Sequence, residues 1–533
     1  MNILVAEPMA EAGIELLKQP GWNVWVSNPK EYQGCLAEAD ALMVRSAVKV
    51  TREVLEKAPR LRVIGRAGVG VDNVDLAAAT AAGVIVMNTP GGNAVSVAEH
   101  TIALILAMAR SIPQASASTK TGKWEKKKFL GNEVRGKTLG VLGLGSIGRE
   151  VVRRARAFEM RIVASDPYVN PQVAEDLSIE LADIDTLFAQ SDYITLHLAL
   201  TPETRNLISR EAIAKMKPGV RIVNCARGEM VDQQALSDAL EAGQVAGAAL
   251  DVFSPEPPGP DLKLLSFDGI VATPHIAGST EEAQEIVGVR IAEQVVDYLK
   301  NGVAVNAVNM PPLTPEQYRT LGPYIGLAER LGSLAAQIAQ GTPTGARLVY
   351  SGKAGDGSTH LIRNSAIVGM LNRWLSRRAT LVNAMQIATD RGLTVSERHG
   401  EKKAAYVDSV TVELETDAGV SSVEGAVVLG KPRLMRVDGI TCEAPLSGHL
   451  LFMKNQDVPG VIGHVGTVLG ENGINIANFS LGRRDHPLAP GEPLEALAVV
   501  ETDAAVSDDV IAQLKQNPAV KVARSVGLIS PAE

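Results

Sequence analysis

The chain has 533 residues, which is more than a single hydrophobic core accommodates, and this length predicts three or four domains. Its formal net charge of -8 argues against a general nucleic-acid-binding protein and against one that binds anionic membranes. The longest apolar run, residues 102–109, is far shorter than the roughly 20 residues that span a bilayer.

The cysteines are few, odd in number and without the spacing of a metal site, which favours a reducing compartment. They are Cys35, Cys225 and Cys442. The first residues predict a strand rather than a targeting segment. We therefore expect a cytoplasmic protein without nucleic-acid or membrane partners and without a metal ion.

The first 95 or so residues alternate predicted strands and helices, a pattern that indicates a doubly wound parallel sheet. Strands are expected at 2–6, 41–45, 61–67 and 83–87, and helices at 9–19 and 54–58. Next, Ser96-Val-Ala-Glu99 has the pattern of a helix-capping box ahead of the apolar residues 101–109. A helix that is apolar nearly all round must be buried, between domains or against a partner subunit. We interpret it as a hinge helix that leads into a second domain.

The second domain opens with the clearest motif of the chain. Residues 138–142 predict a buried strand, which Gly143, Gly145 and Gly148 follow as Gly-x-Gly-x-x-Gly. In such a turn the glycines permit a tight bend, close approach to a pyrophosphate and close helix packing, and the helix N-terminus faces the phosphates. Asp166 ends the next strand, at about the ~20-residue offset at which an acid binds a ribose 2′-hydroxyl. The motif predicts a site for NAD rather than NADP; the alternative is a purely structural turn.

The remaining chain continues the α/β pattern. Further strands of the second domain are expected at 193–198, 221–224, 246–251 and 270–272, and a helix at 281–300 returns to the first domain. A proline-rich linker is expected at 306–315. After it come helices at 323–340 and near 367–387 and a final β-α-β-β-α-β unit. We therefore expect domains at 1–96 with 287–310, at 97–286, at 316–445 and at 449–529.

Three polar residues, Arg227, Glu256 and His275, follow successive strands of the second domain, at the sheet edge where cofactors bind. Hydride transfer needs a group that exchanges the hydroxyl proton, and histidine suits neutral pH. Glu256, if bonded to His275, would fix its tautomer and hold its pKa above the unperturbed ~6.5, while Arg227 would bind a carboxylate. Alternatively, each is an ordinary loop residue. We expect His100 to be structural, and His197 either packs or neighbours the cofactor.

These motifs resemble the D-isomer-specific 2-hydroxyacid dehydrogenases. The resemblance rests on Gly-Leu-Gly-Ser-Ile-Gly, Asn-Cys-Ala-Arg-Gly-Glu, Ser-Pro-Glu-Pro-Pro and Thr-Pro-His-Ile-Ala-Gly-Ser-Thr. Residues 44–51, 65–75 and 88–93 are most similar to family members that oxidise 3-phospho-D-glycerate. The C-terminal part resembles their long form. This implies an α/β fold with two Rossmann-like doubly wound domains, one for substrate and one for NAD, an α/β intervening domain and a C-terminal βαββαβ ACT domain.

The resemblance also implies roles for individual residues. Arg227, Glu256 and His275 would be catalytic, with His275 as the acid/base. Cofactor contacts would come from Gly143, Gly145, Ser146, Ile147, Gly148, Asp166, Cys225, Arg227, Asp251, His275 and Gly278. Substrate contacts would come from Arg45, Arg66, Val69, Gly70 and Asn93. Lys126 and Lys128 lie where relatives place a basic cluster that reaches a neighbouring subunit. The resemblance also implies a homo-oligomer, a dimer or a tetramer.

The similarity to ACT domains rests on Asn455-Gln-Asp-Val-Pro-Gly460 and Gly473-Ile-Asn-Ile476. It implies that Asn455, Asp457 and Asn475 hold L-serine between paired subunits. The alternative is a domain that assembles the oligomer without sensing an effector.

Together these expectations describe NAD-dependent oxidation of 3-phospho-D-glycerate to 3-phosphohydroxypyruvate, the entry to serine synthesis. A glyoxylate/hydroxypyruvate reductase of the same family is one alternative. A non-catalytic, NAD-sensing binding protein is another, and the intact Arg, Glu and His trio counts against it.

Overall fold

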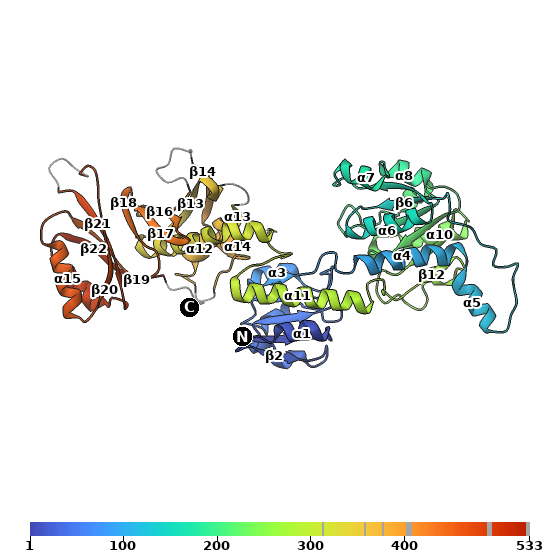
Figure 1. The fold of residues 1–533 in the computed structure, drawn as a ribbon, viewed down its shortest axis with the longest axis horizontal. Helices are drawn as coiled ribbons and strands as arrows, with labels where there is room; N and C mark the ends of the chain where they lie inside the picture. Colours follow the sequence, from blue (N-terminus) through green and yellow to red (C-terminus); the bar gives the residue numbers. More distant parts are fainter. Residues whose placement is uncertain (312–313, 356–358, 376–377, 401–407, 488–492, 529–533) are drawn as a thin grey trace.

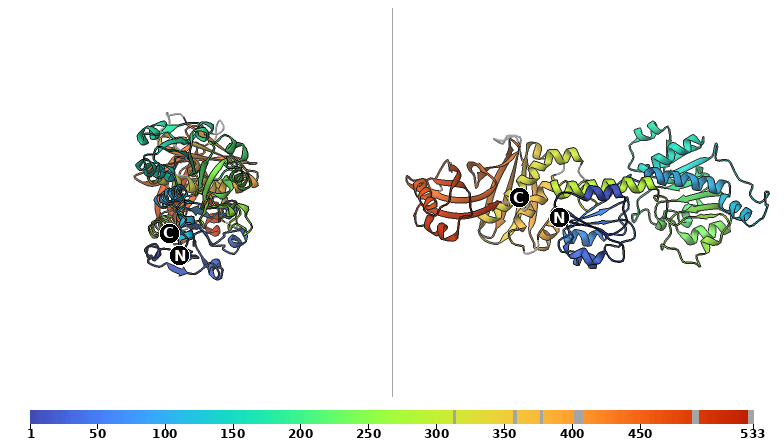
Figure 2. Two further views of the ribbon diagram at one scale, coloured as in Figure 1. Left: turned by 90° about the vertical axis from the view of Figure 1, so that its right-hand side faces the viewer. Right: turned by 60° about the horizontal axis from the view of Figure 1, so that its bottom comes forward.

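The computed structural model describes residues 1–311, 314–355, 359–375, 378–400, 408–487 and 493–528. Four β-sheets lie in an elongated row, with the N-terminal sheet between the second sheet and the two C-terminal ones (Figure 1). The right-hand view of Figure 2 shows the same row from another side. The order in space differs from the order along the chain, because the chain leaves the first domain for the second and then returns.

The N-terminal domain is a five-stranded parallel sheet with strand order β2-β1-β3-β4-β5. Its elements are β1 (Asn2–Val5), α1 (Glu11–Leu17), β2 (Asn23–Val26), the 3-10 helix η1 (Tyr32–Glu38), β3 (Ala41–Val44), α2 (Arg52–Glu56), β4 (Val63–Arg66), α3 (Leu76–Ala82) and β5 (Ile85–Met87). The long helix α11 (Glu281–Asn301) returns to this sheet as expected, and Ile291 and Val295 pack in one buried cluster with Ile3 and Val5. The strand β2 was not predicted; it has four residues and is only partly buried.

The second domain is a seven-stranded parallel sheet with strand order β12-β11-β10-β9-β6-β7-β8. Its strands are β6 (Thr138–Leu142), β7 (Arg161–Ser165), β8 (Glu180–Leu181), β9 (Tyr193–Leu196), β10 (Val220–Asn224), β11 (Val245–Leu250) and β12 (Ile270–Ala272). Its helices include α5 (Ile112–Lys120), α6 (Ser146–Ala157), α7 (Pro171–Leu177), α8 (Ile184–Gln190), α9 (Arg210–Ala214), η2 (Gly228–Met230), α10 (Gln233–Glu241) and η3 (Lys263–Ser266). Because β6 lies between β7 and β9, the strand order reverses there, which is where such sheets bind ligands.

The apolar helix α4 (Ala94–Ala109) is buried as predicted, and its Ile102 and Ile105 belong to the same core cluster as Val151 of α6. The predicted capping box at Ser96–Glu99 is wrong. The helix begins at Ala94, so Ser96 lies inside its first turn, and the Ser96 hydroxyl bonds to Oγ1 of Thr280 at 2.8 Å. Among the described residues no single helix is long and apolar enough to cross a membrane; α4 and α5, bent by 64° at their junction, reach that length and composition only as a pair.

The third domain is a six-stranded sheet with order β14-β13-β15-β16-β17-β18, in which the β13–β14 pair is parallel and the others are antiparallel. Its elements are α12 (Pro315–Ile338), β13 (Pro343–Ser351), η4 (Gly352–Gly355), α13 (His360–Leu371), α14 (Ala384–Asp390), β14 (Thr394–His399), β15 (Ser409–Thr416), β16 (Gly419–Val428), β17 (Lys431–Val437) and β18 (Ile440–Pro445). The expected linker at 306–315 includes residues 312–313, which lie outside the described residues.

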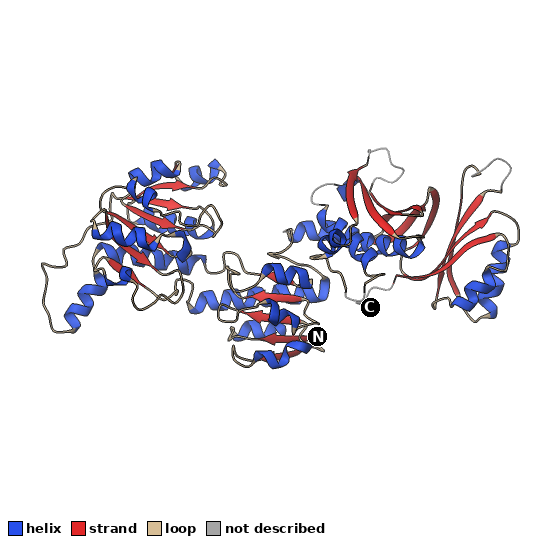
Figure 3. Cartoon of the chain, turned by 180° about the vertical axis from the view of Figure 1, so that it is seen from behind, coloured by secondary structure: helices blue, strands red, loops and turns tan. Residues whose placement is uncertain are grey.

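The fourth domain is the expected β-α-β-β-α-β unit, an antiparallel sheet with order β20-β21-β19-β22. Its elements are β19 (Gly448–Gln456), α15 (Val461–Glu471), β20 (Ile476–Arg483), β21 (Glu495–Thr502), α16 (Asp508–Leu514) and β22 (Val520–Leu528). The two helices cover one face of this sheet (Figure 3). The other face meets the third domain, since Phe452 and Leu497 share a buried cluster with Leu334 and Cys442, and a Cβ at Gly482 would overlap the Thr441 carbonyl oxygen.

This shared core makes the fourth domain depend on the third for stability. We expect Phe452→Ala, which truncates a side chain that is 2% exposed, to destabilise the folded state by about 3–5 kcal/mol through lost burial and the cavity left behind. Differential scanning calorimetry should show a lower temperature for the transition of the C-terminal half. Ile462→Ala on α15, where the side chain is 54% exposed, is the control and should leave that transition in place.

Candidate active site

The glycine turn between β6 and α6 has the geometry that its sequence predicts. Gly143 has φ +94, and a Cβ there would lie 2.6 Å from the carbonyl oxygen of His197. A Cβ at Gly148 would overlap the carbonyl oxygen of Gly143, so this glycine lets the helix pack on the turn. Gly145, the N-cap of α6, has nothing within 4 Å of its Cβ position. The second glycine therefore leaves open space above the helix N-terminus, where a pyrophosphate binds.

Asp166 follows β7 and accepts hydrogen bonds from the backbone N–H of Leu144 at 2.8 Å and of Tyr168 at 2.9 Å. These bonds tie the end of β7 to the glycine turn. Ser146 and Ile147 form the first turn of α6, and Ser146 lies beside Gly91 of the first domain, 3.4 Å from its Cβ position. The glycine turn, the N-terminus of α6 and the carboxylate of Asp166 after β7 together fit a dinucleotide whose ribose carries a free 2′-hydroxyl.

His275 and Glu256 are in direct contact. Nδ1 of His275 lies 2.8 Å from one carboxylate oxygen of Glu256, and the other oxygen accepts the N–H of Phe253 at 2.9 Å. A carboxylate only accepts hydrogen bonds, so the imidazole donates from Nδ1 and its Nε2 is left as the acceptor. The two residues follow the adjacent strands β11 and β12. The predicted pair is thus assembled with a defined tautomer.

The backbone at His275 has φ +54, a left-handed conformation that a side chain other than glycine rarely adopts. The buried carboxylate of Asp251 holds this loop by accepting Thr273 Oγ1 at 2.6 Å, Ile276 N–H at 2.9 Å and Ala277 N–H at 2.8 Å. His100 of α4 lies 3.5 Å from the same carboxylate. Burial raises the pKa of Asp251, but the hydrogen bonds from His100, Thr273 and the two N–H groups outweigh it and leave the pKa below its ordinary value.

Arg227 reaches across to the first domain. Its Nε and Nη2 lie 3.0 and 2.9 Å from one carboxylate oxygen of Asp72, and its Nη1 donates to the Ala226 carbonyl at 2.7 Å. A Cβ at Gly70 would overlap Nη2 of Arg227, so the guanidinium lies against the backbone at Gly70. Arg227 of the second domain thus reaches the backbone segment of the first domain that is predicted to bind a carboxylate.

Two further arginines come from the same edge of the first domain. Burial, followed by the nearby charge of Arg227, lowers the pKa of Arg66 from its ordinary value, and Arg45 adds to that effect. The Nε of Arg66 is buried and has no hydrogen-bond partner among the described residues. Glu7 holds the loop that carries Arg45, accepting the N–H of Arg45 at 2.9 Å and of Val48 at 2.8 Å. Arginines near one another, one of them with an unpartnered donor, have the chemistry that binds an anion.

The remaining predicted substrate residues lie at the same edge. Asn93 is the N-cap of α4, and its Nδ2 lies 2.7 Å from the Cβ position of Gly278 on the His275 loop. Its Oδ1 is buried without a partner among the described residues. The carbonyl of Val69 accepts Asn88 Nδ2 at 2.5 Å, which shapes the turn before Gly70.

Two titratable residues of the second sheet are uncharged near neutral pH. Burial lowers the pKa of His197 to about 3, so the ring is neutral, and Thr195 Oγ1 lies 3.0 Å from its Nε2. Burial raises the pKa of Cys225 to about 12, so it remains a thiol.

The predicted effector residues are separately engaged in the fourth domain. Asn455 is buried and donates from Nδ2 to the Gln456 carbonyl at 2.8 Å. Asp457 pairs with Arg483 at 3.0 Å, and the N–H of Asn475 donates to Asp503 at 3.1 Å.

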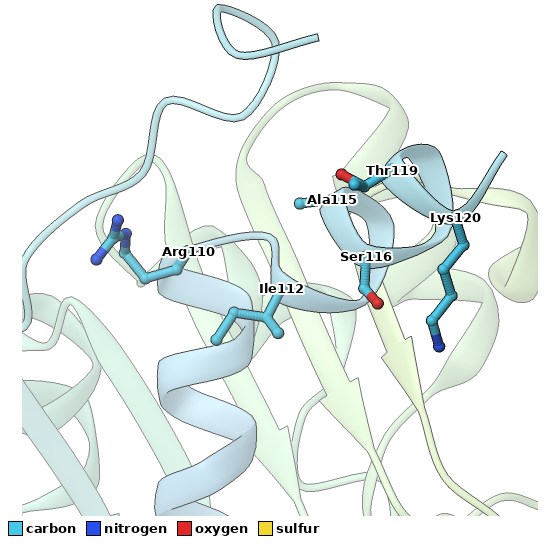
Figure 4. A pocket seen from close by; sticks show the side chains of 6 residues that line it. All are labelled: Arg110, Ile112, Ala115, Ser116, Thr119 and Lys120. Atoms are coloured by element: carbon cyan, nitrogen blue, oxygen red, sulfur yellow. The ribbon is translucent and has the colours of Figure 1, made fainter. Parts of the chain in front are cut away.

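Within the described chain no group of three or more His, Cys, Asp or Glu side chains gathers as a metal site would. A separate pocket at the α4–α5 junction has six lining residues, Arg110, Ile112, Ala115, Ser116, Thr119 and Lys120, which do not include the predicted catalytic residues (Figure 4).

Two carboxylates that organise this site, Glu7 and Asp72, were not predicted from the sequence. Asp251 was predicted as a cofactor residue, and its bonds to the His275 loop were not foreseen. Asp72 lies inside the 65–75 stretch that carried the resemblance, which was the only signal for it.

Comparison with known proteins identifies the parts of the chain. Residues 102–277 match the D-isomer specific 2-hydroxyacid dehydrogenase NAD binding domain, 320–438 the D-3-phosphoglycerate dehydrogenase intervening domain, and 449–519 the ACT domain. Among solved structures, D-lactate dehydrogenase from Aquifex aeolicus, complexed with NAD and lactic acid, is 30% identical with a TM-score of 0.52 and covers 58% of this chain and 100% of its own. A glyoxylate reductase from Paecilomyes thermophila is 31% identical with a TM-score of 0.53, over 60% and 99%.

Two relatives that match along nearly the whole length have the same name. D-3-phosphoglycerate dehydrogenase of Methanocaldococcus jannaschii is 44% identical over 98% of this chain and 98% of its own. The Bacillus subtilis protein of the same name is 36% identical over 99% of both chains. With the dinucleotide turn, the His275–Glu256 pair and the arginines of the cleft, these matches show that the chain belongs to the D-3-phosphoglycerate dehydrogenases, NAD-dependent oxidoreductases.

Proposed function

We propose that this enzyme oxidises 3-phospho-D-glycerate in the cleft between the first and second domains, with Arg227, Glu256 and His275 as its catalytic residues. The observation that carries the proposal is the 2.8 Å contact between His275 Nδ1 and Glu256, because it leaves Nε2 of His275 free to take a proton. His275 accepts the proton of the substrate's C2 hydroxyl, and Glu256 stabilises the imidazolium that forms. The glycine turn and Asp166 would hold NAD, which would supply the hydride acceptor for C2, and the product would be 3-phosphohydroxypyruvate.

Substrate binding is assigned to the positive groups of the cleft. The guanidinium of Arg227 and the backbone at Val69 and Gly70 bind the carboxylate, and Arg45 with Arg66 binds the phosphate. The unpartnered Nε of Arg66 and the mutual repulsion of the arginines support an anion between them. Asn93, with its unpartnered amide oxygen at the domain junction, contributes a polar contact.

Cofactor binding is assigned to the glycine turn with Ser146 and Ile147, and to Asp166. Cys225 and Gly278 line the same edge of the sheet. Since the Asp251 carboxylate is buried and already accepts three bonds from the His275 loop, we assign to Asp251 the positioning of that loop. Residues 1–96 with 287–310 form the substrate domain in this proposal, 97–286 the NAD domain, 316–445 the intervening domain and 449–529 the ACT domain.

The ACT domain is assigned the binding of L-serine, the end product of the pathway, between subunits of a homo-oligomer. The Asp457 carboxylate and the amides of Asn455 and Asn475 suit the ammonium and carboxylate of an amino acid. Asp457 also pairs with Arg483, which provides a cation for the effector's carboxylate.

The role of His275 is tested by substitution. We expect His275→Ala to lower kcat by about 10²–10⁴-fold, the usual contribution of a general base, and Glu256→Gln to lower it less. Steady-state rates of NADH formation measure both. His486→Ala, an exposed histidine of the fourth domain, is the control. A His275→Ala enzyme with wild-type kcat would exclude His275 as the base.

The substrate assignment is tested by comparing 3-phosphoglycerate with unphosphorylated glycerate. Because charge-assisted hydrogen bonds contribute about 1.5–3 kcal/mol each, Arg45→Ala and Arg66→Ala should each raise the KM for 3-phosphoglycerate about ten- to hundredfold and leave that for glycerate nearly unchanged. Arg135→Ala, which removes an exposed arginine paired with Glu159, is the matched control. A wild-type enzyme that prefers glycerate would instead point to the glyoxylate/hydroxypyruvate reductases.

The effector assignment is tested by titrating L-serine. Wild-type activity should fall, and Asp457→Asn should raise the serine concentration needed for half-inhibition about ten- to hundredfold, because the charged partner of the ammonium is lost. Asp485→Asn, an exposed carboxylate outside the predicted site, should respond as wild type does. A wild-type enzyme that ignores serine would leave the fourth domain as a scaffold or as a sensor of another ligand.

A further inference from the structure

The ion pair between Asp72 and Arg227 joins the two domains that form the cleft. Asp72 lies on the turn after β4 of the first domain, and Arg227 follows β10 of the second, 155 residues later. Nε and Nη2 of the guanidinium both bond to the same oxygen of Asp72, at 3.0 and 2.9 Å. This edge of a guanidinium is the one that binds a carboxylate side-on. Asp72 therefore occupies the donors that the proposed function gives to the substrate.

The surroundings of the pair are those of the proposed carboxylate site. The Cβ position of Gly70 lies 2.9 Å from Asp72 Oδ2 and would overlap Nη2 of Arg227, so carboxylate and guanidinium meet on the backbone at Gly70. Arg66 is nearby, repelled by Arg227 and attracted by Asp72. One carboxylate thus sits among the positive groups that otherwise repel one another.

Asp72 can leave this position easily. Its side chain is 64% exposed, whereas that of Arg227 is 29% exposed, so the carboxylate can turn into water while the guanidinium stays in the cleft. Exposed ion pairs are weak, and water readily solvates a released carboxylate. This contrasts with Glu7 and Asp251, which are buried and bonded to several backbone N–H groups.

We propose that Asp72 is a displaceable substitute for the substrate: in the free enzyme its carboxylate holds Arg227 in place and joins the two domains, and the carboxylate of the incoming 2-hydroxy acid displaces it. The inference rests on the proposed role of Arg227 in binding that carboxylate. Asp72 is thus a positioning residue that lowers the apparent affinity for substrate, because each binding event must first break the ion pair. In return, the free enzyme keeps its arginine oriented and its positive charges balanced.

The experiment is a steady-state and binding comparison of wild type with Asp72→Asn, which keeps the size of the side chain and removes its charge. If an exposed pair of ordinary strength competes with substrate, its removal should lower the KM for 3-phosphoglycerate about two- to sixfold. Isothermal titration of 3-phosphoglycerate without NAD should show the same gain in affinity, and the KM for NAD should not change. A KM for 3-phosphoglycerate that is unchanged or higher overturns the proposal, since a purely structural or orienting Asp72 gives that result.

Two further variants separate this inference from the function on which it rests. Asp185→Asn on α8 removes the same charge from an exposed ion pair with Lys215. It should leave the KM values for 3-phosphoglycerate and for NAD unchanged. In an Arg227→Ala background, Asp72→Asn should lose its effect, because there is no guanidinium left to compete for. If Arg227→Ala alone leaves the KM for 3-phosphoglycerate unchanged, the assigned role of Arg227 fails; if it raises the KM while Asp72→Asn does not lower it, only the displacement fails.

Discussion

The buried carboxylate of Asp251 is the interaction on which the catalytic edge depends. It lies at the end of β11 and accepts bonds from the side chain of Thr273 and the N–H groups of Ile276 and Ala277, so it fixes both sides of His275. A left-handed backbone at a residue other than glycine costs about 1–2 kcal/mol, which these charge-assisted bonds offset. The loop then presents His275 to Glu256, which its own backbone bond to Phe253 holds in place. The geometry of the His275–Glu256 pair therefore depends on one buried carboxylate.

The edge of the first domain that carries Arg45 and Arg66 is organised by positive rather than negative charge. The charges of Arg227 and Arg45 both act there on Arg66, whose Nε is itself buried. The carboxylate of Glu7 is occupied by backbone N–H groups of the Arg45 loop, and that of Asp72 is exposed. In the proposed function, selectivity for a phosphorylated acid is then a property of charge balance as much as of shape.

The sequence predicted the local parts of this site well. The glycine turn and the three residues after successive strands were recognisable because a strand, a turn and the next helix are contiguous in the chain. Contacts between distant segments were not recognisable. Asp72 meets Arg227 over 155 residues, and Ser96 meets Thr280 over 184, so the apparent capping pattern at Ser96 had no local meaning. The strand β2, with only four residues and none of them buried, was too short to be distinguished from a loop.

The buried cluster that joins the first domain to the C-terminal half has a consequence for dissecting the enzyme. Met87 and Ala307 of the first domain belong to the same cluster as Met310, Tyr318 and Leu321, which continue into α12 and the third domain. Shorter relatives such as D-lactate dehydrogenase cover 58% of this chain with the whole of theirs. In this chain the part that matches them ends at buried apolar side chains that are shared with the third domain. A fragment cut near residue 311 would expose these apolar side chains to water, so the C-terminal domains also cover part of the core of the first domain.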